Sequence, residues 1–225
     1  MSALESTKNV KLVSVTKSHV DGIPTAEGLI CYVARVSNPA NQMNEQSAPK
    51  LLKYLIKNKH WSPFELVHMT VEIKTSRAIA QQILRHRSFS FQEFSQRYST
   101  ATSMVYYRAR RQDVKNRQNS IDDLSVEVKE QFEELQLDVN QLCANHYSRA
   151  LELGIAKEQA RFLLPLSTAT TLYMSGSMRS WIHYMQLRMD PSTQLEHREI
   201  ANEIYSIFAH NFPNIAAALH DNQRD

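Results

Sequence analysis

A short segment of the chain, residues 85–98, combines arginine, histidine, serine and glutamate in the sequence RHRSFSFQEFSQRY. Gln82, Arg85 and His86 stand three and four residues apart, so on a helix they would share one face. Arginine binds phosphates and planar anions through two parallel hydrogen bonds. A helix ending in these residues could therefore bind an anionic ligand, although cationic side chains also occur at helix ends because they favour the helix dipole.

The second half of the segment alternates in its chemistry. Glu93, Ser95 and Arg97 are separated by single residues, which on an extended segment places an acceptor, a hydroxyl and a cation on one side. Ser95 is a poor nucleophile, because no histidine or aspartate is spaced to activate it. The segment therefore indicates a binding site for a phosphate and a hydrogen-bonding heterocycle.

Positive charge is concentrated in this part of the chain. Residues 76–117 carry nine basic and two acidic side chains, a net charge of +7, whereas the whole chain is +3 and the remainder therefore −4. Two interpretations fit this distribution. One is a pocket for anionic ligands; the other is a basic surface that binds single-stranded nucleic acid through Arg108–Arg117, with Tyr106 and Tyr107 stacking on bases.

The number and spacing of the glycines exclude the common nucleotide-binding loops. The chain has four glycines, Gly22, Gly28, Gly154 and Gly176, and none has the spacing of a GxGxxG turn or a GxxxxGK phosphate loop. A nucleotide would therefore have to bind without a Rossmann fold or P-loop, and side chains would have to meet its phosphates.

The two cysteines, Cys31 and Cys143, lie in apolar helical patterns without a CxxC neighbour. We therefore expect neither a disulfide scaffold nor a thiolate metal site, and no other metal site is predicted. This use of cysteine is consistent with a protein of the reducing cytoplasm. Neither cysteine has an adjacent histidine or basic cluster that would activate its thiol. The longest apolar run has six residues and the first ten carry no basic-then-apolar leader, so neither a membrane span nor secretion is expected.

The sequence predicts both strands and helices to position these residues. Alternating residues predict strands at 9–16, 64–74 and 167–175. Helical spacing and capping residues predict helices at 25–37, 48–58, 124–154, 156–164, 178–188 and 193–208, and one that runs from Ser76 into Arg85–Arg87. Residues 88–120 lack a helical period for most of their length, as functional or disordered loops do. The predicted fold class is α/β (mixed α+β): a single domain over residues 1–225 with a small, mainly antiparallel sheet and about six helices.

The longest predicted helix, 124–154, is amphipathic. Its apolar side chains fall near one face together with one histidine: Phe132, Leu135, Val139, Leu142, His146 and Leu151. Such a helix could also serve as an oligomerisation module.

Four spaced motifs resemble the flavin-dependent thymidylate synthases. Arg85-His86-Arg87, seven further residues and then Ser95 resemble the RHR-x7-S signature of that family. KHWSPFE at 59–65, ARFLLP at 160–165 and the segment 178–188 resemble its histidine-containing segment, its ARxxLP segment and its late helix. The match covers about residues 10–215 in the right order, and four motifs together are far more specific than any one.

The resemblance implies a homotetramer whose active sites are each built from several subunits, and FAD bound in an extended form without a Rossmann fold. Matching positions imply FAD contacts from Ser37, His60, Ser62, Arg85, His86, Arg87, Glu93, Ser177, Arg179 and His183. They imply dUMP contacts from Gln82, Arg85, Glu93, Ser95, Gln96, Arg97, Arg161 and Arg188. Ser177 and His183 stand where asparagines often occur in the family.

The activity implied by the resemblance is reductive methylation of dUMP to dTMP. Methylenetetrahydrofolate supplies the carbon, reduced FAD supplies the hydride, and NADPH reduces the flavin again. Uracil C5 must become electron-rich to attack the one-carbon donor, and neither cysteine suits a thiolate addition at C6. An arginine at the uracil N3/O2 edge, assigned by the resemblance to Arg188, favours the ring anion and needs no enzyme nucleophile. The implied partners are dUMP, folate, NADPH and further copies of the chain, with no nucleic acid and no membrane.

Several of these residues also have a purely structural interpretation. Arg188 could interact with its helix dipole, His60 could be a turn residue, and His183 could lie on an exposed helix face. The colour of the purified protein separates the two function classes, since a flavoprotein is yellow and a nucleic-acid-binding protein is colourless.

Overall fold

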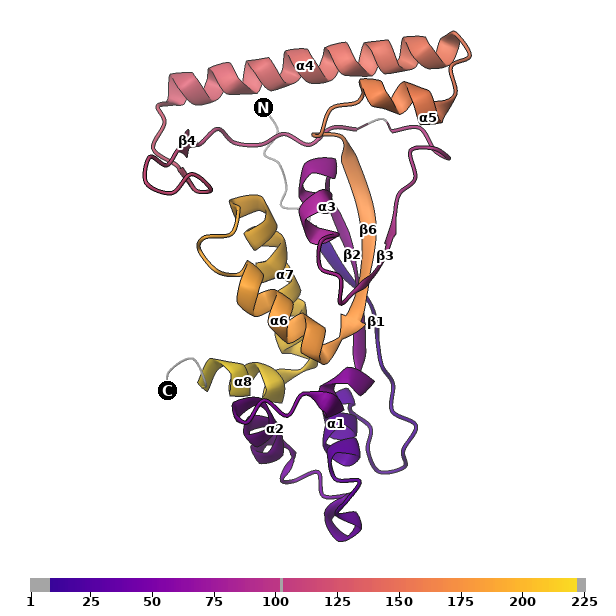
Figure 1. The fold of residues 1–225 in the computed structure, drawn as a ribbon, viewed down its shortest axis with the longest axis vertical. Helices are drawn as coiled ribbons and strands as arrows, with labels where there is room; N and C mark the ends of the chain where they lie inside the picture. Colours follow the sequence, from indigo (N-terminus) through magenta and orange to yellow (C-terminus); the bar gives the residue numbers. More distant parts are fainter. Residues whose placement is uncertain (1–8, 102, 222–225) are drawn as a thin grey trace.

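A computed structural model describes residues 9–101 and 103–221, arranged as in Figure 1. The main sheet has four antiparallel strands in the order β1-β2-β6-β3. These strands are β1 (Val10–Val15), β2 (His68–Ser76), β3 (Ser90–Glu93) and β6 (Ala169–Ser177). The central strands β2 and β6 pair along their whole length, from His68 opposite Ser177 to Ser76 opposite Ala169.

One face of the sheet forms the core. Met69, Val71 and Ile73 of β2 are fully buried at alternate positions, as expected for a strand with one covered face. Three helices cover this face: α3 (Arg77–Ile83), α6 (Met178–Arg188) and α7 (Leu195–Asn211) (Figure 1). Trp181 of α6 is fully buried and donates a hydrogen bond from Nε1 to the Met69 carbonyl at 2.9 Å, which fixes α6 against the sheet.

The helices α1 (Ala26–Ala34), α2 (Ala48–Lys57) and α8 (Pro213–Asp221) gather at one end of the sheet (Figure 1). Glu27 of α1 is 5% exposed and accepts hydrogen bonds from Ile215 N at 2.8 Å and Asn214 Nδ2 at 2.7 Å. Burial raises the pKa of Glu27. A carboxylate at the start of α8 is favoured by the helix dipole, and this contact links α1 to α8.

The helices α4 (Val126–Glu152) and α5 (Lys157–Ala160) lie at the opposite end (Figure 1). The predicted long helix is confirmed, and Ser125 caps it by accepting a hydrogen bond from Val128 N at 3.4 Å. Its expected apolar face is largely uncovered, since the apolar side chains along it are 39–62% exposed: Phe132, Leu135, Val139 and Leu142. Within the described residues, nothing buries this face.

Several boundaries differ from the sequence prediction. Strand β2 begins at His68 rather than at residue 64, because Ser62–Leu66 forms a 3-10 helix with Pro63 at its start, where the fixed proline φ favours a helical turn. The segment 156–164 divides into α5 and a 3-10 helix, Arg161–Leu163. Strand β6 extends to Ser177.

The described residues contain eight α-helices rather than about six. The unpredicted α8 starts at Pro213, directly after α7, because proline is well suited to a first helical position. Residues 88–120 hold β3 and two short paired strands, β4 (Arg111–Gln112) and β5 (Ser120–Ile121), and a 3-10 helix, Pro39–Asn41, follows α1. No helix within residues 9–101 and 103–221 combines the length and apolar character needed to cross a bilayer.

Candidate active site

The RHR segment lies in a turn between α3 and β3. Ser76 caps α3, as predicted, but the helix ends at Ile83 and does not continue into Arg85. His86 N donates to Ile83 O at 3.1 Å in the turn that follows. Of the three residues expected on one helical face, only Gln82 is helical, so that prediction is wrong.

The helix ends early because Phe89 must reach the core. Its ring is 8% exposed and packs edge-on against Trp181, with ring centroids 4.7 Å apart. A Cβ added to Gly176 of β6 would lie 2.4 Å from the Phe89 ring, so only glycine allows this approach. The anchored phenyl ring fixes where the RHR turn leaves the helix.

His86 and Arg188 form the most direct contact among the predicted site residues. Arg188 is the last residue of α6, and its Nε donates to His86 Nε2 at 2.8 Å. Because an arginine N–H can only donate, His86 Nε2 must be unprotonated. Burial, together with Arg188 and His183, lowers the pKa of His86 to about 4, so the ring is neutral at neutral pH. Neither terminal nitrogen of the Arg188 guanidinium has a hydrogen-bond partner in the described part of the chain.

Two residues that the sequence did not single out support this contact. Tyr184 is fully buried, and its ring lies edge-on to His86 with centroids 4.9 Å apart. Its hydroxyl contacts Nε2 of the fully buried His197 at 3.1 Å, and His197 Nδ1 lies 3.4 Å from Gln82 Oε1. Burial, then Arg188 and His86, lower the pKa of His197 to about 3. Gln82, His86 and Arg188 are therefore brought together around two buried side chains.

Glu93, at the end of β3, is held by two neighbours. Its Oε1 accepts a hydrogen bond from Thr170 at 2.9 Å and forms an ion pair with Arg77 Nη1 at 2.8 Å. Arg77 also donates to the Phe94 carbonyl at 2.6 Å. The second carboxylate oxygen of Glu93 has no partner among the described residues, so it can accept a bond from a ligand.

The expected extended arrangement of Glu93, Ser95 and Arg97 is wrong beyond Glu93. The chain turns at Ser95, whose carbonyl accepts hydrogen bonds from the backbone N–H groups of residues 98 and 99 at 3.2 and 3.0 Å. This turn brings Arg97 to Glu158 of α5, with Nη2 at 3.1 Å from the carboxylate. Arg161 Nε donates to the Glu158 carbonyl at 3.2 Å. Two of the arginines predicted to contact dUMP therefore lie beside α5.

Glu65, Ser177 and Arg179 form a third group. Ser177 caps α6 and donates from Oγ to Glu65 Oε2 at 2.6 Å, while Arg179 pairs with Glu65 Oε1 at 2.8 Å. The Ser177 hydrogen bond and then Arg179 lower the pKa of Glu65. Serine at position 177, in place of asparagine, thus acts as a helix cap and a carboxylate partner. Beside it lies a polar cavity of about 250 Å³ lined by Glu65, His68, Ser88, Ser90, Ser175, Gly176, Ser177 and Ser180.

The side chains of the other predicted site residues form no hydrogen bond or ion pair with these groups in the described part of the chain. Arg85, Arg87 and His183 are exposed, and the described residues offer the two arginines no ion pair. His60 lies edge-on to Tyr54 with ring centroids 5.7 Å apart. Three others lie near the ends of elements: Ser37 three residues after α1, Ser62 at the first residue of the 3-10 helix, and Gln96 in the turn after β3.

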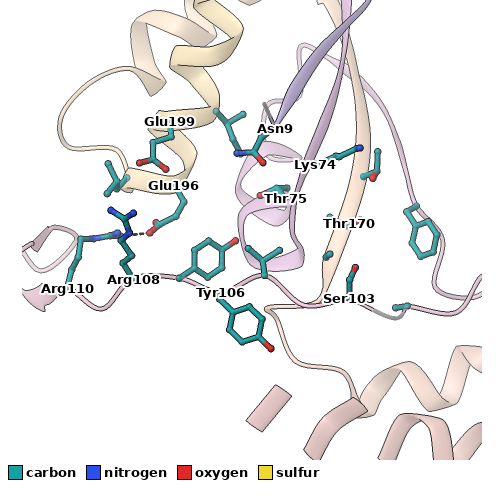
Figure 2. Close-up of a pocket in the computed structure, with 18 of the residues that line it drawn as sticks. Asn9, Lys74, Thr75, Ser103, Tyr106, Arg108, Arg110, Thr170, Glu196 and Glu199 are labelled. Carbon is teal, nitrogen blue, oxygen red and sulfur yellow. Dashed lines mark ion pairs between the residues drawn. The ribbon is translucent and has the colours of Figure 1, made fainter. Parts of the chain in front are cut away.

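A larger cavity, of about 750 Å³, lies between α7, the ends of β2 and β6, and the segment before β4 (Figure 2). Its labelled side chains include Lys74, Tyr106, Arg108 and Glu199, and none of the residues predicted to contact FAD or dUMP lines it. It is nevertheless connected to them, because Thr170 in its wall holds Glu93. The predicted residues lie mainly on open surface rather than in this cavity.

The basic segment is less cationic than its sequence indicates. Arg110 pairs with Glu196 at 2.6 Å, and both side chains are 13% exposed. Arg111 pairs with Asp123 at 2.6 Å, and Lys129 of α4 pairs with Asp122 at the same distance. These contacts neutralise part of the surface that a nucleic acid would need.

Neither cysteine belongs to a site. Cys31 is 1% exposed, and burial raises the pKa of its thiol to about 11. Cys143 lies part-buried on α4. Among the described residues, no group of three or more His, Cys, Asp or Glu side chains is placed to hold a metal ion.

Sequence reasoning missed three residues that contact the predicted site residues: Glu65, Tyr184 and His197. Glu65 belongs to the KHWSPFE segment, so its signal was present in a motif already singled out. His197 has no spacing relation to any motif, and only the fold brings it to Gln82, 115 residues earlier.

Comparison with known proteins gives a consistent result. A sequence model of the family described as thymidylate synthase complementing protein matches residues 16–214. The chain is 55% identical over 212 residues to the "Probable flavin-dependent thymidylate synthase" of Paramecium bursaria Chlorella virus 1, covering 94% of this chain and 98% of that protein. It is 56% identical over 214 residues to the flavin-dependent thymidylate synthase of Synechocystis sp., covering 94% and 99%.

A solved structure with a similar fold is that of the UMP/dUMP methylase PolB from Streptomyces cacaoi bound with 5-Br dUMP. It has a TM-score of 0.82 at 25% sequence identity, and the match covers 94% of both chains. The family resemblance of the four motifs is thus confirmed over nearly the whole sequence. This chain is an enzyme that belongs to the flavin-dependent thymidylate synthases, the thymidylate synthase complementing protein family.

Proposed function

We propose that this enzyme converts dUMP to dTMP by reductive methylation, with methylenetetrahydrofolate as carbon donor, FAD as bound cofactor and NADPH as reductant. The names of the relatives support the flavin, and the dUMP analogue named with the PolB structure supports the nucleotide. The observation that carries the proposal is the contact between Arg188 and a neutral His86.

That contact prepares the Arg188 guanidinium for a planar ligand. Its Nε is held by His86, so the group is fixed as a fork whose two terminal nitrogens have no hydrogen-bond partner in the described residues. Two parallel donors fit the N3/O2 edge of uracil. Hydrogen bonds from a cation stabilise the ring anion more than the neutral ring, and the anion is electron-rich at C5. The buried Cys31 thiol, with its raised pKa, supports a route without an enzyme nucleophile.

The residues around the smaller cavity fit a flavin. Serine hydroxyls and the Glu65 carboxylate in the cavity wall offer hydrogen bonds. The exposed Arg87 and Arg179 directly precede the lining residues Ser88 and Ser180 in the sequence, and with Arg85 they offer cations for a pyrophosphate. When bound, FAD supplies the hydride. We propose that the residues implied by the family motifs hold it: Ser37, His60, Ser62, Arg85, His86, Arg87, Glu93, Ser177, Arg179 and His183. A cavity of about 250 Å³ is smaller than the usual pocket of a drug-sized ligand, so one chain provides only part of this site.

The dUMP site is proposed to be shared between subunits. Arg97 and Arg161 meet beside α5, and no hydrogen bond or ion pair within the described ranges joins them to His86 or Arg188. If one copy supplies the phosphate ligands and another supplies Arg188, both groups can act on one nucleotide. Gln82, Arg85, Glu93, Ser95 and Gln96 complete the proposed set. The uncovered apolar face of α4 supports assembly into the homotetramer, because such surfaces mark protein interfaces.

The test is direct. The purified enzyme is expected to be yellow, with oxidised-flavin absorbance, and to form dTMP only when dUMP, methylenetetrahydrofolate and NADPH are all present. Its mass in solution, measured by light scattering, is expected to be that of four chains. A colourless protein that makes no dTMP, and that binds oligonucleotides with steep salt dependence, would refute the proposal in favour of nucleic-acid binding.

A further inference from the structure

A single chain of hydrogen bonds fixes the direction of the Gln82 side-chain amide. The chain ends at Glu196, a carboxylate that can only accept hydrogen bonds. Gln194 Nε2 donates to Glu196 Oε2 at 2.9 Å, so the Gln194 carbonyl oxygen must point the other way, toward Gln82. Gln82 Nε2 donates to that oxygen at 2.6 Å. The Gln82 carbonyl oxygen is thereby directed at His197.

The same logic continues through the histidine. Since Gln82 Oε1 can only accept, His197 Nδ1 must carry the proton, and Nε2 of the neutral ring must then be the acceptor. The Tyr184 hydroxyl is 3.1 Å from that nitrogen and is its donor. Every amide and ring orientation in the series is thus determined by the carboxylate at its end.

Both ends of the series are anchored. Glu196 is paired with Arg110 at 2.6 Å in the wall of the larger cavity (Figure 2), and Arg110 also donates to Ser120 Oγ at 2.8 Å. Tyr184 is fully buried and lies against the ring of His86, which holds Arg188. Turning the Gln82 amide over would place its carbonyl oxygen against the carbonyl oxygen of Gln194, so the contact with Gln194 favours one orientation of the amide.

We propose that His197 is a positioning residue for dUMP, which acts by holding the Gln82 amide with its carbonyl oxygen toward His197 and its remaining N–H and lone pair toward the nucleotide. This inference rests on the proposed function, in which Gln82 contacts dUMP. Tyr184 is a second positioning residue, because its hydroxyl lies 3.1 Å from Nε2 and can donate to the tautomer of His197 that Gln82 requires.

Two variants of similar shape separate this role from a packing role. His197→Asn keeps an amide N–H near the position of Nδ1, so it can still donate to Gln82. His197→Gln keeps an amide oxygen near the position of Nε2, so it can still accept from Tyr184, but it loses the donor to Gln82. Both replacements are neutral and polar, so neither introduces a buried charge.

The experiment measures dUMP binding to the flavin-loaded enzyme by titration calorimetry. We expect His197→Asn to retain dUMP affinity within about twofold and His197→Gln to weaken it about tenfold, with unchanged flavin content in both. In a Gln82→Ala background, His197→Gln is expected to have no further effect on dUMP affinity, because its influence passes through Gln82.

Equal losses in the two histidine variants, or a full loss in the Gln82→Ala background, would overturn the positioning role while leaving the proposed function intact. A wild-type enzyme that binds no dUMP and forms no dTMP would instead overturn the proposed function and this inference together. If neither variant loads flavin, the same double-mutant comparison on urea unfolding decides: additive effects of His197→Gln and Gln82→Ala would overturn the contact on which the inference depends.

Discussion

Acid is expected to destabilise this enzyme through a buried histidine. His197 is fully buried and its pKa in the folded protein is about 3, against an ordinary value of 6.5. The unfolded chain therefore takes up a proton at this residue as the pH falls below 6.5, whereas the folded chain does not. Stability that is complete above pH 6.5 is lost progressively as the pH falls toward 3.

The magnitude follows from the width of that window. At pH 5 the medium is 1.5 pH units below the ordinary histidine pKa and still well above the folded value. Each unit is worth about 1.36 kcal/mol, so His197 alone removes about 2 kcal/mol from the free energy of unfolding between pH 7 and pH 5. This is a large part of the stability of an ordinary domain, about 5–15 kcal/mol.

The assay is urea unfolding at half-unit steps from pH 7 to pH 5, followed by the fluorescence of the two tryptophans, Trp61 and the buried Trp181, at fixed protein concentration. The wild type is compared with His197→Asn, which cannot titrate, and with the exposed control His19→Asn. His197→Asn is expected to lose about 2 kcal/mol less than the wild type over this range, whatever its stability at pH 7. Equal losses in the wild type and His197→Asn would show that the reasoning about this histidine is wrong.

Four further outcomes are expected. Arg188→Ala should slow single-turnover dTMP formation about a hundred- to thousandfold at saturating dUMP with unchanged flavin content, and Arg188→Lys should restore little, since a point charge lacks the parallel donors; a rate within a few-fold of wild type would remove this arginine from the chemistry. A variant with both Cys31 and Cys143 replaced by serine should keep dTMP formation, and an inactive but folded, flavin-bound variant would show that a thiol is needed. Ser95→Ala should stay measurably active, whereas inactivation with unchanged dUMP affinity would indicate a nucleophile. Gly176→Ala should lower the melting temperature and disturb flavin binding, because its Cβ would lie 2.4 Å from a core phenyl ring; thermal unfolding at wild-type temperature would contradict that contact.

Local signals predicted the elements whose ends are set by local chemistry. Helix α6 was expected at residues 178–188 and is found there, because Ser177 caps it. The end of α3 was misjudged because no glycine or proline follows Ile83; the helix stops where Phe89 is drawn into the core, which is a tertiary effect. The α4 pattern identified which residues share a face, but periodicity does not say what covers that face.

In the candidate site, too, sequence motifs predicted some contacts, and only the tertiary fold determines others. Arg188 and His86 were expected from motifs and do lie in contact. Ser95 and Arg97 were expected on one side of an extended segment, but a turn not signalled by glycine or proline separates them. His197 was missed because a lone histidine in an amphipathic helix has the sequence signature of an ordinary core residue.

The strand order has a consequence for the chain while it is being synthesised. The central pair of the sheet joins β2 to β6, so the partner of each β2 residue leaves the ribosome roughly a hundred residues later. At about 5–20 residues per second, β2 waits on the order of 5–20 seconds with β1 on one edge and nothing on the other. Glu72 and Lys74 put a charge of each sign on this strand, and charged side chains discourage a waiting edge from pairing with another nascent chain.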